Sequence, residues 1–404
     1  MGDLKKRRNR KKKQKMLVIL MLCLLVILGV VLGVSVWKKI QFSDADKSNT
    51  QLSDFIDTEN EETGAIDGTE ALVNTEVTGN LNTEEQGIED FTMFFTGDVM
   101  LENCTSIYGQ KGITGIITSF LQQEMVSADM TVINNEFPFS TRGEQAPDKQ
   151  FTFRVDPSYV SILQDMGVDV ASLANNHALD FGVDALLDTF TTLEDAGIPY
   201  VGAGETKERA EEAIFVEAGG RTVGVLSASR VIPVYQWNIE SRQPGLFCTY
   251  DSTRLVQRIQ EIESQCDYVV VFVHWGIERN AYPEEYQRAL AKQYIDAGAD
   301  LVVGNHSHVP QGIEYYKGAP IVYCLGNYIF NSNMTDTYTL KVVWDAEGKT
   351  SLQAIPVDTR NYLTGELTGN EAQAFYDYLE SISFGVTIDE NGYVTNVEDC
   401  GMPE

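Results

Sequence analysis

The segment from Asp300 to Gln311, which reads D-L-V-V-G-N-H-S-H-V-P-Q, constrains this chain more than any other. A short apolar run at 301–303 ends abruptly at Gly304, and His306 and His308 follow at a spacing of two. Two imidazoles so close in an extended or turning segment can converge on one metal ion. A polar turn that holds two histidines by chance explains this segment equally well when it is considered alone.

The distribution of histidines favours the metal site. The 404-residue chain has only four, His177, His274, His306 and His308, and each lies just beyond an apolar run with the composition of a buried strand. Histidines that serve only local structure would rarely all occupy that kind of position. We therefore predict that the four imidazoles lie together.

Apolar runs alternate with amphipathic segments from Phe91 onward. The strands that this pattern predicts are 91–96, 130–133, 168–173, 268–273, 301–303 and 321–325. The predicted helices lie near 114–124, 157–166, 182–196, 251–264, 284–297 and 370–382. A hairpin is expected to turn at Gly219 and Gly220. The alternation predicts an α/β fold in which helices cover a sheet.

A polar cluster follows each of five predicted strands. The clusters are Gly97-Asp98, Asn134-Asn135-Glu136, Asn175-Asn176-His177 with Asp180, His274-Trp275-Gly276 with Glu278, and the segment 304–308. In open α/β sheets, ligands bind in the crevice at the carboxyl ends of the strands. This placement would gather all the histidines, two carboxylates and several carboxamides into one crevice.

The donor atoms of that crevice suit a divalent transition metal. Carboxylate oxygens from Asp98 and Glu136 combined with imidazole nitrogens form a mixed set that fits Mn, Fe or Zn. A carboxylate can bridge two metals about 3.5–4 Å apart, and such a pair activates water at neutral pH. We therefore expect two divalent metal ions.

Each cluster also has a simpler explanation on its own. Gly97-Asp98 is a common turn after a strand, and Asp180 could cap a helix that starts near Gly182. Trp275 could be a packed wall of the pocket, and Glu278 a solvated surface acid. The metal site is predicted from their co-location.

The amino-terminal part of the chain differs sharply in charge from the rest. Nine basic residues in 5–15 precede 22 uncharged, mostly apolar residues at 16–37, a length that spans a bilayer core of about 30 Å. A cleavable signal peptide would have a shorter apolar core and a small-residue cleavage site, which this run lacks. We predict a cytoplasmic segment at 1–15 and a single transmembrane helix at 16–37.

The positive-inside rule places everything after this anchor outside the cell. Residues 38–90 have too few large apolar side chains to offset the entropy of ordering, so we expect a disordered acidic stalk. We expect one domain at 91–336 and a β-rich extension at 337–404 packed on it.

The whole chain has a net charge of -29 although its first 39 residues carry +10, so the acidic remainder argues against nucleic-acid binding. A disulfide between Cys104 and Cys400 is neither supported nor opposed.

Six segments occur in an order that resembles the CapA family. They are G-D-V-M-L from Gly97, N-N-E from Asn134, A-N-N-H-A-L-D-F-G from Ala174, H-W-G-I-E from His274, G-N-H-S-H-V-P-Q-G from Gly304 and L-G-N-Y-I-F from Leu325. CapA proteins act in capsule and poly-γ-glutamate synthesis and belong to the calcineurin-like metallophosphoesterase superfamily. The resemblance covers about residues 92–331.

The resemblance implies a four-layer α/β/β/α metallophosphoesterase-like sandwich with a dinuclear metal site at the sheet edge. The implied metal ligands are Asp98, Glu136 as the bridge, Asn176, His274, His306 and His308. His177 would protonate the leaving group, and the residues expected to bind substrate are Asn135, Trp275, Glu278 and Asn327. The superfamily's first motif is Asp-x-His, whereas this chain has Met100 at its third position, and a thioether is a poor ligand for hard metals.

The resulting expectation is a membrane-anchored extracellular protein of a bacterium that acts in synthesis, release or anchoring of an anionic surface polymer. Its site would be a metal-dependent hydrolase site for a phosphoester or a γ-glutamyl amide. The expected partners are the polymer or its precursor and a membrane-embedded synthesis complex. Two alternatives stay open: a non-catalytic polymer-binding assembly factor, and a secreted metal-dependent phosphodiesterase unrelated to capsule.

Overall fold

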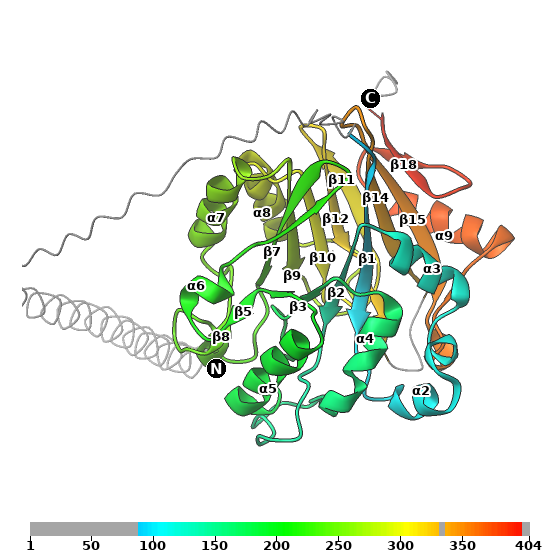
Figure 1. The fold of residues 1–404 in the computed structure, drawn as a ribbon. Helices are drawn as coiled ribbons and strands as arrows, with labels where there is room; N and C mark the ends of the chain where they lie inside the picture. Colours follow the sequence, from blue (N-terminus) through cyan, green and yellow to red (C-terminus); the bar gives the residue numbers. More distant parts are fainter. Residues whose placement is uncertain (1–87, 331–335, 398–404) are drawn as a thin grey trace, which may run out of the picture. The chain divides into compact units, whose positions relative to one another are not determined.

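The computed structural model describes residues 88–330 and 336–397, and two β-sheets form the centre of this part of the chain (Figure 1). The first sheet has ten strands within these ranges, eight of them in the order β17-β18-β15-β14-β1-β2-β3-β4. The bounds of these eight, in that order, are Val386–Ile388, Tyr393–Asn396, Thr350–Asp358, Thr337–Trp344, Phe91–Val99, Met130–Asn135, Val170–Ser172 and Tyr200–Val201. In addition, β13 (Asn327–Ile329) pairs with β1, and β16 (Gly365–Glu366) pairs with β15.

The second sheet has six strands among the described residues, in the order β11-β12-β10-β9-β7-β6. Their bounds, in that order, are Gln311–Tyr316, Ala319–Cys324, Leu301–Asn305, Tyr268–His274, Arg221–Ser229 and Ile214–Ala218. The four central strands are parallel, and β6 and β11 run antiparallel at the two edges. A separate short pair is formed by β5 (Ala203–Gly204) and β8 (Gly245–Leu246).

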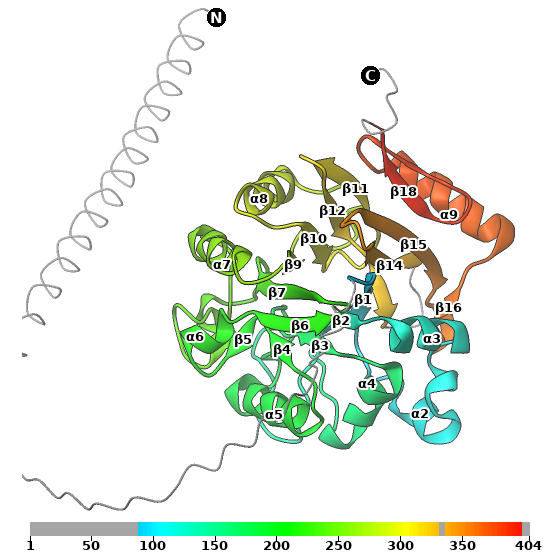
Figure 2. The same ribbon diagram turned by 45° about the horizontal axis from the view of Figure 1, so that its top comes forward.

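Helices cover the outer faces of the two sheets (Figure 2). The helices on the first sheet are α2 (Thr105–Lys111), α3 (Ser119–Ser127), α4 (Ser161–Met166) and α5 (Gly182–Asp195). The helices on the second sheet are α7 (Thr253–Glu263) and α8 (Glu285–Asp296). The short helix α6 (Lys207–Ala210) follows β5, and α9 (Gly369–Ser381) buries its apolar side chains against the core between the sheets.

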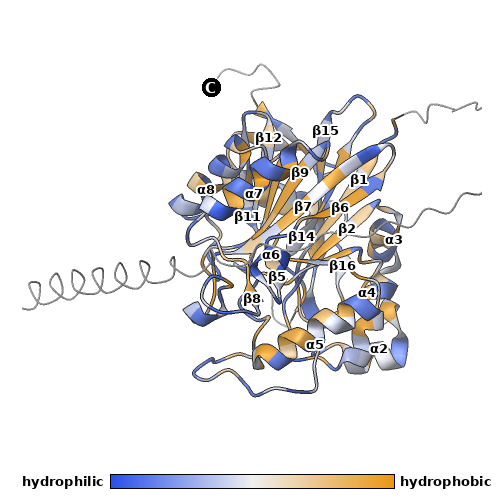
Figure 3. Cartoon of the chain, turned by 60° about the vertical axis from the view of Figure 1, so that its left-hand side comes forward, coloured by the Kyte–Doolittle hydropathy of each residue, from blue (hydrophilic) through white to orange (hydrophobic). Residues whose placement is uncertain are grey.

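The alternation of side chains along the strands separates an inner core from two outer ones. Phe95 of β1 faces the second sheet and stacks on Phe272 of β9, with ring centroids 5.9 Å apart. Its neighbour Phe94 belongs to the core beneath the helices of the first sheet. The strands are largely orange in Figure 3, as expected for sheets that are covered on both faces.

The predicted mixed α/β fold is confirmed, and every predicted strand overlaps an observed one. One predicted helix is wrong in its position. The helix expected near 114–124 begins later: Ile113–Gly115 form a 3-10 turn, and α3 covers the remainder of the segment from Ser119 onward. The physical reason is the cap, because the Thr118 side chain accepts a hydrogen bond from the backbone N–H of Leu121 and so sets the start of the helix.

The carboxyl-terminal segment contributes strands to the first sheet. β14 lies between β1 and β15, and it pairs antiparallel with β1 from Phe91, opposite Trp344, to Phe95, opposite Leu340. The strand that begins the described part of the chain is therefore held by one near its end. The segments expected at 91–336 and 337–404 share one sheet.

Several sequence predictions fall outside the described residues. They are the basic segment 1–15, the anchor 16–37 and nearly all of the stalk 38–90. No helix within 88–330 and 336–397 is long and apolar enough to cross a membrane. Cys400 also lies outside the described residues, and Cys104 is buried.

Gly304 of β10 occupies a position where no side chain fits. A Cβ atom there would lie 2.1 Å from the carbonyl oxygen of Tyr323 and 2.4 Å from Nε1 of Trp275. Gly304→Ala should therefore lower the free energy of unfolding by about 3 kcal/mol, because the neighbouring strand and the packed indole would both have to move. Unfolding of the full chain by urea measures the change.

Gly109→Ala in α2 is the matched control. Nothing lies within 4 Å of a Cβ atom at Gly109, and alanine favours a helix over glycine by about 1 kcal/mol. This control should raise stability slightly. Equal losses in the two variants would contradict the steric explanation.

Candidate metal centre

The polar residues that end the strands meet at one edge of the two sheets. β1, β2 and β3 are parallel to one another, and so are β7, β9 and β10, so each group presents its carboxyl ends together. Side chains from the two sheets are in contact there: Nε2 of His274 lies 2.7 Å from Oδ1 of Asn176, and Nδ1 of His308 lies 3.1 Å from Oδ2 of Asp98. The polar residues begin inside the ladders rather than after them, since Asp98 still pairs with Asn134.

Glu136 is common to two groups of candidate ligands. It forms one group with His274 and His306 and a second with Asp98 and His308, and within each group one ligand atom per residue lies within 4.8 Å of the others. These five side chains, here called the ligand cluster, are all buried. The geometry offers two adjacent cation positions that share one carboxylate.

Two carboxamides orient the ligand cluster. Nδ2 of Asn134 donates to Oδ1 of Asp98 at 2.8 Å and lies 3.3 Å from Nδ1 of His274. Oδ1 of Asn327 lies 2.9 Å from Nδ1 of His308. Asn134 therefore fixes one residue of each group, a role that the sequence prediction did not give it.

Buried polar atoms without a hydrogen-bond partner gather at this edge. Among the described residues, they include Oε1 of Glu136, Oδ1 of Asn135, Nδ1 of His306 and both amide atoms of Asn305. A buried polar atom left without a partner costs about 1–3 kcal/mol. A bound cation and its water molecules would satisfy such atoms, so the residues present fit a divalent metal.

Burial keeps two of the imidazoles neutral. Burial and the neighbouring His306 lower the pKa of His274 well below its usual value, and burial lowers the pKa of His306 to about 3. Burial also acts to lower the pKa of His308, but the hydrogen bond with Asp98 and the negative charges of Glu136 and Asp98 together outweigh it and raise that pKa to about 9. Burial, followed by Asp98, raises the pKa of Glu136. Because a metal ligand must be deprotonated, His274 and His306 are ready for a cation, whereas His308 must release a proton to bind one.

The loop after β10 holds its histidines in an uncommon backbone conformation. The φ angle is 103° at His306 and 58° at His308. Residues other than glycine rarely adopt positive φ angles. Such strain costs about 1–3 kcal/mol per residue and is found mainly at functional sites. The loop is fixed at Ser307, whose Oγ donates to the Val309 carbonyl and whose carbonyl accepts from the N–H of Arg279, both at 2.7 Å.

His177 lies beside the ligand cluster, and Asp180 and Phe153 hold its ring in place. Its Nε2 is 3.9 Å from Oε1 of Glu136, whereas its Nδ1 is 2.7 Å from Oδ2 of Asp180. The ring of Phe153 packs on the imidazole, with centroids 4.5 Å apart. Burial lowers the pKa of His177.

The alternative in which Asp180 caps a helix is wrong. The N-cap of α5 is Phe181, and within the described residues no side chain caps that helix. The Asp180 carboxylate is instead occupied by His177, the ammonium of Lys149 and the N–H of Phe153.

Trp275, expected to bind substrate, is placed elsewhere. It is fully buried in the core between the second sheet and its helices, where it stacks with Tyr294 and donates Nε1 to the Tyr323 carbonyl at 2.9 Å. Successive side chains of an extended strand point to opposite faces. Because His274 points to the ligand cluster, Trp275 points away from it and offers no surface to a ligand.

The other predicted substrate-binding residues lie at or near the cluster. Asn135 is buried and donates to the Phe137 carbonyl at 2.7 Å, and Asn327 contacts His308 as described above. Glu278 is exposed. Burial lowers the pKa of Lys149, and Glu278 is near enough that its charge acts in the opposite direction. Met100 is fully buried in the apolar core beneath the helices of the first sheet.

Lys149 is part of the site and was missing from the sequence prediction. Its ammonium lies 2.9 Å from Nδ1 of His177 and also contacts Asp180 and the Asn176 carbonyl. It comes from the connection that runs from the end of β2 to the 3-10 turn Pro157–Val160. A connection of more than about 12–15 residues without secondary structure of its own is usually functional, and this length was the one available signal.

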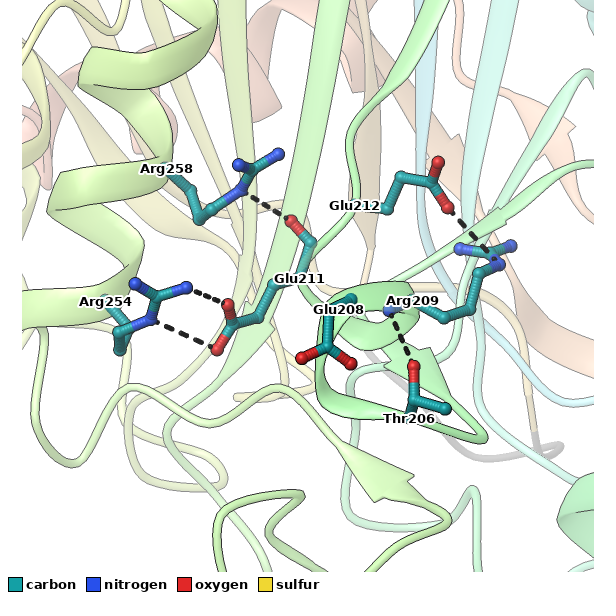
Figure 4. Close-up of a pocket in the computed structure, with 7 residues that line it drawn as sticks. All are labelled: Thr206, Glu208, Arg209, Glu211, Glu212, Arg254 and Arg258. Carbon is teal, nitrogen blue, oxygen red and sulfur yellow. Dashed lines mark hydrogen bonds and ion pairs between the residues drawn. The ribbon is translucent and has the colours of Figure 1, made fainter. Parts of the chain in front are cut away.

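A surface pocket of about 440 Å³ contains none of the residues of the ligand cluster (Figure 4). It is lined by Thr206, Glu208, Arg209, Glu211, Glu212, Arg254 and Arg258. Arg254 pairs with the Glu211 carboxylate, and Nε of Arg258 donates to the Glu211 carbonyl at 3.1 Å. The arginines are already paired with glutamates, so the pocket is a structural ion network that ties α7 to the segment after α6.

The fold and the site together define an α/β protein with a candidate metal centre at the edge of two packed sheets. Residues 92–332 match the family described as bacterial capsule synthesis protein PGA_cap. The chain belongs to this capsule synthesis family, and the CapA resemblance of its six motifs is confirmed.

Two curated relatives illustrate the similarity. PGA biosynthesis protein CapA of Bacillus subtilis (strain 168) is 32% identical over 246 residues, which cover 60% of this chain and 64% of that protein. Capsule biosynthesis protein CapA of Bacillus anthracis is 30% identical over 260 residues, which cover 62% of each chain. The match thus spans less than two thirds of either relative. Among solved structures, a hypothetical protein from Thermus thermophilus is similar with a TM-score of 0.37 and 16% identity, over 69% of this chain and 96% of that one.

Proposed function

We propose that this chain is a membrane-anchored extracellular CapA-family protein that acts in the synthesis, release or anchoring of an anionic surface polymer through a metal-dependent hydrolytic site. The observation that carries this proposal is that Glu136 belongs to two groups of buried ligands. We relate the paired sheets and outer helices to the four-layer α/β/β/α sandwich of calcineurin-like metallophosphoesterases. Two divalent cations, Mn, Fe or Zn, would be held by the ligand cluster, with Asn176 beside His274 and His306.

The chain's own residues supply positioning and proton transfer. Bound divalent metals would lower the pKa of a water molecule and polarise a phosphoryl or carbonyl oxygen of the substrate. His177 directs Nε2 toward the ligand cluster, 3.9 Å from Glu136, so this nitrogen can donate a proton to the leaving group. Asp180 occupies the Nδ1 side of the ring.

We propose a phosphoester or a γ-glutamyl amide as the bond that is cleaved. The names of the Bacillus relatives refer to PGA and capsule biosynthesis, which favours the polymer or its precursor as the partner, together with a membrane-embedded synthesis complex and without nucleic acid. Met100 in place of a ligand histidine favours the second candidate, a non-catalytic polymer-binding assembly factor, because the cation position of Asp98 and His308 then has one imidazole instead of two. A secreted phosphodiesterase unrelated to capsule is the third.

Metal analysis and turnover of the purified full chain test these candidates together. We expect about two equivalents of metal, and turnover of bis-4-nitrophenyl phosphate or γ-glutamyl-4-nitroanilide that chelation abolishes. Bound metal without turnover of either compound would favour the assembly factor. The third candidate, the secreted phosphodiesterase, would be favoured by two results together. These are turnover of bis-4-nitrophenyl phosphate by the purified chain and an unchanged surface polymer in cells that lack the protein.

The proposed topology makes a separate prediction. The nine basic residues of 5–15 should keep the amino terminus in the cytoplasm and place residues after 39 outside. Protease added to intact cells should cut within 40–90 and release the folded part. A folded part that stays protected until the cells are lysed would contradict this topology.

A further inference from the structure

The connection between β2 and α4 forms a wall beside His177. It is fastened at two points to one residue, because the N–H of Ala146 donates to the Asp180 carbonyl at 2.7 Å and the N–H of Phe153 donates to Oδ2 of Asp180 at 2.8 Å. Phe153 also packs on the His177 ring. Both attachment points of the connection therefore converge on the turn that carries the proposed general acid.

Lys149 lies between these two attachment points and reaches into the same turn. Its side chain is only 12% exposed, and its ammonium donates to the Asn176 carbonyl and to Oδ1 of Asp180 and also lies beside Nδ1 of His177. An ammonium group has three hydrogens to donate. Two of them are donated to the oxygens of Asn176 and Asp180, so the protein itself holds this ammonium.

The contacts of Lys149 complement those of Asp180. The Asp180 side chain is fully buried, and a buried carboxylate requires a compensating charge, which the ammonium supplies. One hydrogen bond from the imidazole to Asp180 fixes the distance between the two groups but not the tilt of the ring. Lys149 ties that ring to the backbone of Asn176, the neighbouring residue that faces His274.

We propose that Lys149 is a positioning residue that, together with Asp180, holds the His177 imidazole with Nε2 directed toward the ligand cluster. This role rests on the proposed hydrolytic function, because His177 acts as the proton donor there. Lys149 contacts neither substrate nor metal in this arrangement. It acts through His177.

Lys149→Met tests the role, because methionine keeps most of the side-chain length and removes the charge. In the full chain supplied with Mn²⁺, with whichever of the two chromogenic substrates the wild type hydrolyses, kcat should fall about 10- to 100-fold, as for other outer partners of an active site. KM should change less than about twofold, since the ammonium is buried and held by oxygens of Asn176 and Asp180. Lys341→Met is the matched control: it removes an ion pair with Glu124, 2.8 Å long, between β14 and α3, and should leave kcat unchanged.

A double-mutant cycle separates positioning from a general loss of structure. If Lys149 acts through His177, Lys149→Met should cause no further loss of turnover in a His177→Ala background. An equal fold-loss in both backgrounds would overturn the proposal. Wild-type kcat in Lys149→Met would overturn it as well, and so would a large rise in KM at unchanged kcat, which would make Lys149 a substrate-binding residue.

Amide hydrogen exchange provides a readout that does not need turnover. Lys149→Met should speed exchange in the peptides that contain Phe153 and His177, because both depend on the fixed position of Asp180. Unchanged exchange would overturn the positioning role even if the wild type hydrolysed neither substrate. Faster exchange in a chain without turnover would overturn only the proposed function.

Discussion

Glu136→Gln should remove both bound metals at once. Glutamine keeps the size of the side chain but lacks the negative charge, and Glu136 is the one residue common to both groups of ligands. We expect binding at both positions to weaken by more than the roughly 10- to 100-fold that follows removal of an outer partner. Calorimetric titration of the metal-free full chain measures both positions.

Three single substitutions serve as controls for this expectation. His306→Ala should weaken the position shared with His274, and His308→Ala the position shared with Asp98, each leaving the other position filled. Glu278→Gln removes an acid that is exposed and lies outside both groups, so it should retain both metals. Tight binding of one metal by Glu136→Gln would show that this carboxylate is not shared.

His177→Ala should have the opposite result, with metals retained and turnover lost. His177 belongs to neither group of ligands, and its Nε2 only faces Glu136 at 3.9 Å. Removing a general acid typically lowers the rate about 10²- to 10⁴-fold, so we expect a loss of that size at unchanged metal content. Metal analysis and turnover are measured on the same preparation.

The division of roles between the histidines is open to a direct contradiction. If His177→Ala loses as much metal as His306→Ala, then His177 is a ligand rather than a proton donor. If His177→Ala keeps both metal and turnover, the leaving group obtains its proton elsewhere.

The positions of the strands could be predicted from the sequence because each buried strand is a continuous apolar run. The run at 268–273 appears as β9, Tyr268–His274, and the run at 301–303 as β10, Leu301–Asn305. The difference lies at the ends, where the polar residues His274 and Asn305 remain paired with each other in the ladder. Apolar composition therefore indicates where a strand is buried but not where its hydrogen bonds end.

Features that depend on distant contacts or lack an apolar pattern could not be predicted. α2 has no buried residue, so no periodicity marks it in the sequence. Lys149 joins the site only through contacts with a turn about 30 residues further along the chain. Trp275 was expected to bind substrate, although alternation along an extended chain directs it and its neighbour His274 to opposite faces.

The pairing of β1 with β14 determines when β1 can be fully paired during synthesis. β1 carries Asp98, yet its antiparallel neighbour comes about 250 residues later, with Phe91 opposite Trp344. A nascent chain therefore leaves Phe91–Phe95 of β1 unpaired on this side until β14 has been made, and sheets built from such distant partners fold slowly. Premature termination before β14 would yield a chain that contains every residue of the ligand cluster but lacks the strand that pairs with Phe91–Phe95, the part of β1 that leads to Asp98.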